Sequence, residues 1–350
     1  MEDNEVFRIK KFMDIIKFIC VVMLILIHAH MALVTNQYSF FDTSALSYEM
    51  TSRFMFIGLF ITILPALAGY VFGLQKKIDI KKTITLFLLF LCVGFFMNVI
   101  TWGWAYIFSW NVLQFVGLSF LVIAILMKFL TEYEVFLLSV ITIMAAAFLS
   151  NILAPYNPNN WVAIFVGGRN EFVLWPFFPW FGVVGSGFLY AKYRVKYGGR
   201  KWFNAISLVG GLFFMAVAIL RGEISARIDP DYVWGPSILT PTLGWILATL
   251  GLFLILVVLG SLFSEKIKLR KYGIINSYSK GIMWIYVAQM FVSFRMAIFA
   301  KKFFETDNPS IGYFLFMIVM LVIGWLVGVI SIKLFQEKKM VIFLKKYNGE

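Results

Sequence analysis

The chain contains two histidines, His28 and His30, and both lie in the last third of an apolar segment over residues 13–35. An imidazole exchanges protons near neutral pH, so it can act as an acid or a base. Ionisable side chains at membrane depth are costly and usually face the interior of a helix bundle or a water-filled cavity. These histidines are therefore candidates for a functional site. The alternative is a structural role, in which a histidine only hydrogen-bonds a neighbouring helix.

Helical geometry places three polar residues of this segment on one face. The eleven residues from Lys17 to His28 turn an α-helix by about 1100°, or three turns and about 20°, and span about 16 Å along its axis. Asp14 falls on the same side, whereas His30 points elsewhere. One face thus carries a carboxylate and an ammonium near one end and an imidazole near the other. The alternative for Asp14 and Lys17 is a local ion pair at the membrane interface.

The composition indicates which elements must hold these residues. Of the 350 residues, 61% are hydrophobic and only 14% are charged, which is more apolar surface than a soluble core needs. A membrane span needs roughly 20 apolar residues to cross a hydrocarbon core of about 30 Å. We therefore predict an all-α polytopic membrane bundle of about ten transmembrane helices. The predicted spans are 13–35, 53–74, 83–103, 110–130, 135–153, 173–191, 203–220, 240–262, 281–300 and 311–334.

The basic residues predict the partners and the orientation of these spans. The formal net charge is +13, but Lys and Arg lie in short clusters between the apolar runs, so we expect no nucleic-acid partner. If the N-terminus is cytoplasmic, most of the 31 basic residues fall in cytoplasmic segments, as the positive-inside rule requires. We expect both termini to be cytoplasmic, in the inner membrane of a bacterium.

Other features bear on domain count and covalent structure. Cys20 and Cys92 each lie within an apolar run, so no disulfide framework is expected. The first apolar run is followed by no convincing small-residue cleavage site, which predicts a retained span rather than a signal peptide. No internal repeat, low-complexity tract or linker divides the chain, and one domain over residues 1–350 is the simplest expectation.

The first predicted span carries a known pattern. The segment Asp14-Ile15-Ile16-Lys17, followed by ten residues and His28, resembles the D-x-x-R…x10-H signature of a transmembrane acyltransferase superfamily. Two branches share this signature: the heparan-α-glucosaminide N-acetyltransferase-like family, and the acyltransferase-3 family that O-acylates surface sugars. Lys17 stands where the pattern usually has Arg, which keeps the charge but loses the planar guanidinium.

Later segments resemble the first branch and follow the order of that family. Gln289 departs from it, because the late span often has a histidine at this position. No clear Arg-x-x-Arg follows the second span, which disfavours the acyltransferase-3 branch. The segments that resemble the family are Leu64–Gly73, Asn111–Leu118, Phe178–Gly187, Pro236–Gly251 and Ile285–Val287.

This resemblance implies an acyltransferase that uses acetyl-CoA or another acyl-CoA. The donor would enter from the cytoplasm, and a carbohydrate or lipid-linked glycan would accept the acyl group from the other side. His28 would be a general base or a transient acyl carrier, with Lys17 and Asp14 beside it in the catalytic set. Intramembrane amides would stabilise the oxyanion. The donor-binding residues would be Lys17, Asn98, Gln114, Gln289 and Arg295.

Several alternatives stay open at this level. The three amides can equally be hydrogen-bonding contacts between helices, and Arg295 can pair with a phosphate or with a buried carboxylate. The main rival function is a proton- or anion-coupled transporter or flippase that uses the same polar residues. No metal is expected, because two histidines at i and i+2 with no carboxylate beside them make poor ligands. The acceptor, the acyl chain and the oligomeric state, a homodimer included, are not determined.

Overall fold

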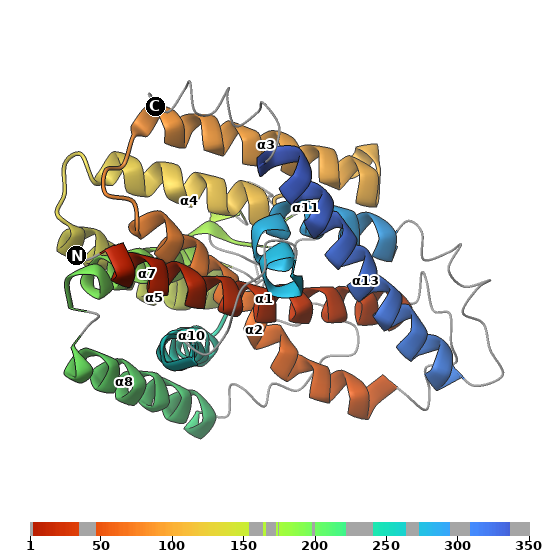
Figure 1. Ribbon diagram of the computed structural model, residues 1–350. Coiled ribbons are helices and arrows are strands. Elements are labelled where there is room, and N and C mark those ends of the chain that lie inside the picture. The colour runs from red at the N-terminus through yellow and green to blue at the C-terminus, as the bar shows by residue number, and fades with distance from the viewer. Residues whose placement is uncertain are drawn as a thin grey trace. The chain divides into compact units, whose positions relative to one another are not determined.

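The structure, a computed structural model, describes residues 3–34, 47–153, 164–165, 173, 175–197, 200–221, 241–263, 273–294 and 309–336. These residues form ten α-helices and one 3-10 turn, η1 (Trp104–Tyr106), which confirms the predicted all-α polytopic membrane bundle (Figure 1). The helices are α1 (Asp3–Val34), α2 (Ser47–Gly73), α3 (Ile80–Trp102), α4 (Val112–Leu126), α5 (Glu132–Leu153), α7 (Phe177–Tyr197), α8 (Lys201–Leu220), α10 (Leu243–Phe263), α11 (Ile274–Phe294) and α13 (Pro309–Gln336).

Each predicted span overlaps one of these helices, although the limits differ, and residues 295–300 of the span 281–300 lie outside the described residues. The difference that matters most for the candidate site is at the start of α11. The predicted span begins at residue 281, whereas the helix begins at Ile274. The first residues of α11 include Asn276, Ser277 and Ser279, which lower the hydropathy without interrupting the backbone hydrogen bonds. A span prediction that follows hydropathy therefore starts about two turns late.

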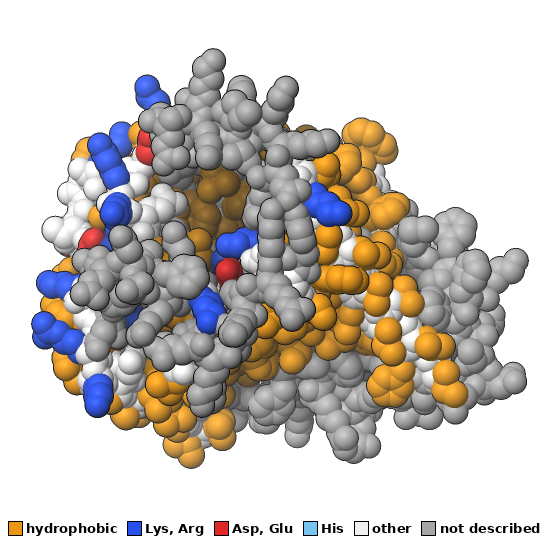
Figure 2. All heavy atoms as spheres, viewed as in Figure 1, with side chains coloured by type: hydrophobic (Ala, Val, Ile, Leu, Met, Phe, Trp, Pro, Cys, Tyr) orange, Lys and Arg blue, Asp and Glu red, His pale blue; other side chains and the backbone are white. Residues whose placement is uncertain are grey.

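The surface of the described residues is that of a protein in lipid. Within the described ranges, five segments are long and apolar enough to cross a membrane: Lys11–Ala29, Ile80–Trp102, Lys201–Leu220, Leu243–Leu262 and Phe314–Leu334. Large hydrophobic side chains such as Leu88, Phe96 and Phe213 are exposed. Figure 2 shows hydrophobic side chains over much of the viewed face. Such a surface is stable where hydrocarbon replaces water, because the exposed side chains then need no burial.

Contacts divide the chain into two compact units. The first comprises Met1–Ile61 and Leu259–Glu350, and the second comprises Thr62–Val258. The expectation of a single domain over residues 1–350 stays a prediction.

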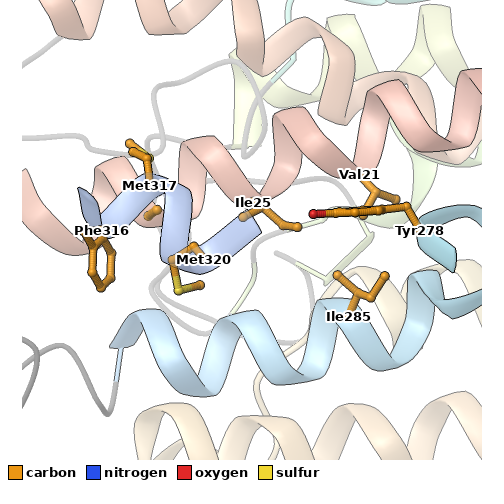
Figure 3. Packing of buried hydrophobic residues seen from close by; sticks show 8 residues of the cluster. Val21, Ile25, Tyr278, Ile285, Phe316, Met317 and Met320 are labelled. Atoms are coloured by element: carbon orange, nitrogen blue, oxygen red, sulfur yellow. The ribbon is translucent and has the colours of Figure 1, made fainter. Parts of the chain in front are cut away.

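The first unit is built on helix α1. This helix packs against α11 and α13, which also pack against each other. The three helices contribute the buried cluster that Figure 3 shows. The phenol of Tyr278 lies in this cluster and donates a hydrogen bond to the carbonyl of Leu321. The cluster comprises Val21, Ile25, Ala29, Tyr278, Ile285, Phe316, Met317 and Met320.

Glycines allow close helix contacts in the second unit. A Cβ on Gly69 of α2 would overlap the carbonyl of Val184 in α7, and one on Gly187 of α7 would overlap the carbonyl of Ala66 in α2. A Cβ on Gly185 of α7 would overlap the side-chain hydroxyl of Ser139 in α5. Small residues let helix backbones approach closely, which is the main source of attraction between helices in lipid.

Candidate functional site

The polar face of α1 lies against α11. His28 is 3% exposed and Asp14 is 6% exposed, so neither faces lipid. Both side chains contact polar side chains of α11, His28 near one end and Asp14 near the other. The apolar residues between these positions, such as Val21 and Ile25, belong to the buried cluster of this unit. The helix pair therefore holds two polar sites separated by packed apolar side chains.

The imidazole of His28 makes a hydrogen bond to a buried amide. Gln289 Nε2 lies 2.6 Å from His28 Nδ1, and Gln289 itself is 1% exposed. The ring of Tyr286, one turn earlier on α11, has its centroid 6.0 Å from that of the imidazole. Among the described residues, the other amide atom, Gln289 Oε1, is buried and has no hydrogen-bond partner. His28 is thus fixed in orientation by α11, and one strong acceptor beside it is unused.

The second site is centred on the carboxylate of Asp14. Its Oδ1 accepts a hydrogen bond from the hydroxyl of Ser279 and lies 3.7 Å from Lys17 Nζ. Its Oδ2 lies 3.6 Å from Lys280 Nζ. The ion pair between Asp14 and Lys17 is therefore present, but it is part of a larger group. One carboxylate faces two ammonium groups, so this group carries a net charge of about +1 when all three are ionised.

The two sites define the direction of the helices. Asp14 precedes His28 on α1 by fourteen residues, or about 21 Å of helix. Their partners Ser279 and Gln289 occur in the same order on α11. The two helices are therefore parallel.

Asn98 and Gln114 lie in the second unit, where both are buried. Asn98 Nδ2 donates to the carbonyls of Ile107 and Ser109, at 3.2 and 2.7 Å, and Gln114 Nε2 donates to the carbonyl of Ser109 at 3.2 Å. Gln114 Oε1 accepts from the N–H of Asn111 at 3.2 Å and completes the capping box of α4. These amides hold the connection between α3 and α4, and their role in donor binding stays a prediction.

Arg295 lies outside the described residues, and so does the side chain of His30. The structure brings together Asp14 with Lys17 and His28 with Gln289, and it adds residues that the sequence argument did not select. Ser279 and Lys280 complete the carboxylate site, and the buried hydroxyl of Ser293 lies one turn beyond Gln289. A partial signal was present, because Ser279 and Lys280 are polar residues that precede the intramembrane amide Gln289 on the same helix.

A sequence profile described as "Heparan-alpha-glucosaminide N-acetyltransferase, catalytic" matches residues 8–233. The chain belongs to this family. The match includes the first-helix signature with Asp14, Lys17 and His28. No curated protein and no solved structure matches the chain.

Membership of the heparan-α-glucosaminide N-acetyltransferase family confirms the first of the two branches named above. The chain is an integral membrane protein of the acetyltransferase type. The matched region ends before α11. The family match therefore says nothing of the contacts of His28 with Gln289 and of Asp14 with Lys280, which come from the structure alone.

Proposed function

We propose that this protein transfers an acetyl group from cytoplasmic acetyl-CoA to an amine or hydroxyl of a carbohydrate-type acceptor on the other side of the membrane. Family membership supports the reaction class. The observation that carries the proposal is the buried imidazole of His28, fixed by Gln289 on a helix pair whose other end carries excess positive charge.

The chain offers suitable groups for the donor. The ammonium groups of Lys17 and Lys280 share the single carboxylate of Asp14, and their side chains are 21% and 42% exposed. The positive charge that Asp14 does not balance attracts the phosphates of the donor. Lys17 precedes His28 by about 16 Å along α1. A donor bound by its phosphates here must therefore extend its thioester arm along the helix pair to reach the imidazole.

In the proposed reaction the acceptor nitrogen or oxygen forms a bond to the carbonyl carbon of the thioester, and the carbon–sulfur bond breaks. His28 Nε2 takes the proton that the acceptor loses and passes it to the departing thiolate. The products are the acetylated acceptor and CoA, with no net change in the enzyme. In the alternative path, Nε2 itself carries the acetyl group between donor and acceptor.

The first prediction concerns His28. We expect His28→Ala to reduce acetyl transfer at least about 100-fold, because general base catalysis contributes about that factor or more. The measurement uses purified protein in liposomes, labelled acetyl-CoA on one side and a panel of amino sugars and glycans on the other. The thermal midpoint in detergent should stay within a few degrees of wild type.

His30→Ala is the matched control, since it removes the other histidine from the same helix and should leave transfer unchanged. Equal losses in the two variants would contradict a specific role for His28. If the wild-type protein transfers no acetyl group but moves protons or anions across the liposome membrane, the transporter is the correct function.

A further inference from the structure

We propose that Gln289 is a positioning residue that keeps Nδ1 of His28 hydrogen-bonded in each protonation state and so reserves Nε2 as the reacting nitrogen. This inference rests on the proposed function, because it assigns the chemistry of the imidazole to one of its two nitrogens. Gln289 contacts neither donor nor acceptor in this proposal; it acts through His28.

The packing of the two helices fixes this contact. Gln289 and His28 are both nearly inaccessible, and Gln289 Nε2 lies 2.6 Å from His28 Nδ1. A hydrogen bond in such an environment is strong, because no water competes for either atom. Nδ1 is therefore occupied by protein and cannot serve a substrate.

A primary amide can pair with this nitrogen in two ways. In the orientation of the structure, the amide NH2 donates to Nδ1, so the proton of a neutral imidazole lies on Nε2. Rotation of the amide by 180° exchanges its two ends, and Oε1 then accepts a hydrogen bond from Nδ1–H. In that second orientation Nε2 carries the lone pair that a base or nucleophile requires.

The unsatisfied atoms around this contact support the second orientation. Among the residues that the structure describes, Gln289 Oε1 is buried without a hydrogen-bond partner, and an unsatisfied buried acceptor costs about 1–3 kcal/mol. The rotated amide pairs this oxygen with Nδ1–H. The hydroxyl of Ser293, four residues further on the same face of α11, is also buried and has no hydrogen-bond partner within the described part of the chain. Because residues four apart on a helix are neighbours, we infer that the oxygen of Ser293 can accept from the amide NH2 after rotation.

The reaction gives a reason to use an amide here. When His28 Nε2 takes a proton from the acceptor, both ring nitrogens carry hydrogen. Only the amide oxygen can then pair with Nδ1, whereas the amide NH2 suits the neutral ring protonated on Nε2. Both reacting states of His28, the neutral base with its proton on Nδ1 and the imidazolium, therefore need an acceptor at Nδ1, which the amide oxygen provides and an aliphatic side chain does not.

The test measures the tautomer of His28 directly. With His30 replaced by Asn, His28 is the single histidine of the chain, so selective 15N-histidine labelling reports this one ring. We expect the Gln289-containing protein at neutral to basic pH to show Nδ1 protonated and Nε2 unprotonated. Gln289→Leu should shift the population toward the Nε2-protonated tautomer, which predominates in free histidine.

The kinetic test uses three variants in α11. Gln289→Leu should lower kcat about 100-fold with the KM for acetyl-CoA within about twofold, since the base is in the wrong tautomer. Gln289→Glu should restore kcat to within about tenfold of wild type, because its carboxylate also accepts from Nδ1–H. Ser277→Ala is the matched control: it removes another buried hydroxyl of the same helix that has no hydrogen-bond partner among the described residues, and it should leave kcat unchanged.

Each outcome decides the proposal. A wild-type kcat in Gln289→Leu, or an unchanged tautomer in the 15N spectra, overturns it. An equal loss in Gln289→Leu and Gln289→Glu also overturns it, because acceptance from Nδ1–H is then not the relevant property. If wild-type protein performs no acetyl transfer, the proposed function fails, while the 15N spectra still decide whether Gln289 sets the tautomer.

Discussion

At the scale of single residues, Asp14 is the organising group of the charged site. Its two oxygens pair with different lysines, and Oδ1 also accepts from Ser279. Without the carboxylate, two ammonium groups would face each other at the edge of the membrane. Asp14 therefore stabilises the contact between α1 and α11 and places Lys17 beside Lys280, which is the arrangement that we assign to the donor phosphates.

We predict that Asp14→Asn lowers the stability of the protein by about 2 kcal/mol, the range for hydrogen bonds to a charged group. The loss should appear as a lower thermal midpoint in detergent. Lys280→Gln in the same chain should recover part of it, because the repulsion between the two ammonium groups is then removed. If the stability changes of Asp14→Asn and Lys280→Gln simply add in the double variant, Asp14 and Lys280 are not coupled.

The control for Asp14 is an exposed carboxylate. Glu132 lies 4.0 Å from Lys192, and its side chain is 45% exposed. Exposed ion pairs contribute little, typically about 0–1 kcal/mol. Glu132→Gln should therefore leave the thermal midpoint nearly unchanged. Equal effects of Glu132→Gln and Asp14→Asn would indicate a general response to lost charge.

The sequence located one half of the site but not its partners. The spacing of Asp14, Lys17 and His28 defines a face of one helix, since the helical repeat is fixed by geometry. Ser279 and Lys280 could not be found in this way, because their contact with Asp14 depends on which helix packs against α1. Gln289 was selected as an intramembrane amide, but its pairing with His28 required the structure.

At the scale of elements, glycines determine how closely two helices approach. In the second unit, a Cβ on Gly211 of α8 would lie 2.8 Å from the carbonyl oxygen of Gly251 in α10. The reciprocal Cβ on Gly251 would lie 2.7 Å from the carbonyl oxygen of Gly211. Both obstacles are backbone atoms, which cannot turn aside as a flexible side chain can. The two helices must therefore separate if either glycine gains a side chain.

Adjacent glycines in α8 provide a matched pair of variants. We predict that Gly211→Val destabilises the protein by about 1–3 kcal/mol, the usual cost of overpacking. A Cβ on Gly210 would meet nothing within 4 Å, so Gly210→Val should have little effect. Thermal midpoints in one detergent compare the two. A larger loss for Gly210→Val would contradict the contact between α8 and α10.

Close glycine contacts of this kind also occur in two of the segments that resemble family motifs. Gly69 and Gly187 lie in segments selected for their resemblance to family motifs, and both occupy the contact between α2 and α7. The helices themselves could be predicted from the sequence, because long apolar runs are a strong signal. The pairs of helices that pack together could not be predicted, because an apolar helix has nearly the same hydropathy on the face that meets lipid and on the face that meets another helix.

At the scale of the molecule, the contacts of Lys192 show which helix ends lie on the same side of the second unit. Lys192 Nζ, near the end of α7, donates to the carbonyl of Gln75 at 3.1 Å and pairs with Glu132 at the start of α5. Gln75 follows α2, and Lys76 and Lys77 lie beside it. The C-terminal ends of α2 and α7 and the N-terminal end of α5 thus lie on one side of the second unit. Helices that cross a membrane in alternating directions would have these ends on the same side. The positive-inside rule predicts that this side faces the cytoplasm.

The last prediction tests this orientation by cysteine labelling. Cys20 is buried and Cys92 lies within α3, and both are replaced first so that each variant has one thiol. Lys76→Cys and Lys201→Cys should react with a membrane-impermeant maleimide only after the cells are lysed. Trp104→Cys, at the opposite end of α3 and 77% exposed in the native chain, should react in intact cells. We expect this difference between Lys76 and Trp104 because α3, which lies between them, has 23 residues and is about 35 Å long, enough to cross the membrane.

The opposite labelling pattern would place the loop after α2 outside the cytoplasm. Because α1 precedes α2 by one crossing, Asp14, Lys17 and Lys280 would then lie at the extracytoplasmic end of their helix pair, and His28 would lie toward the cytoplasm. A cytoplasmic acyl-CoA would have no basic site at its point of entry, so the proposed direction of transfer would fail. The hydrogen bond between Gln289 and His28 would be unaffected, since it lies within one unit and does not depend on orientation.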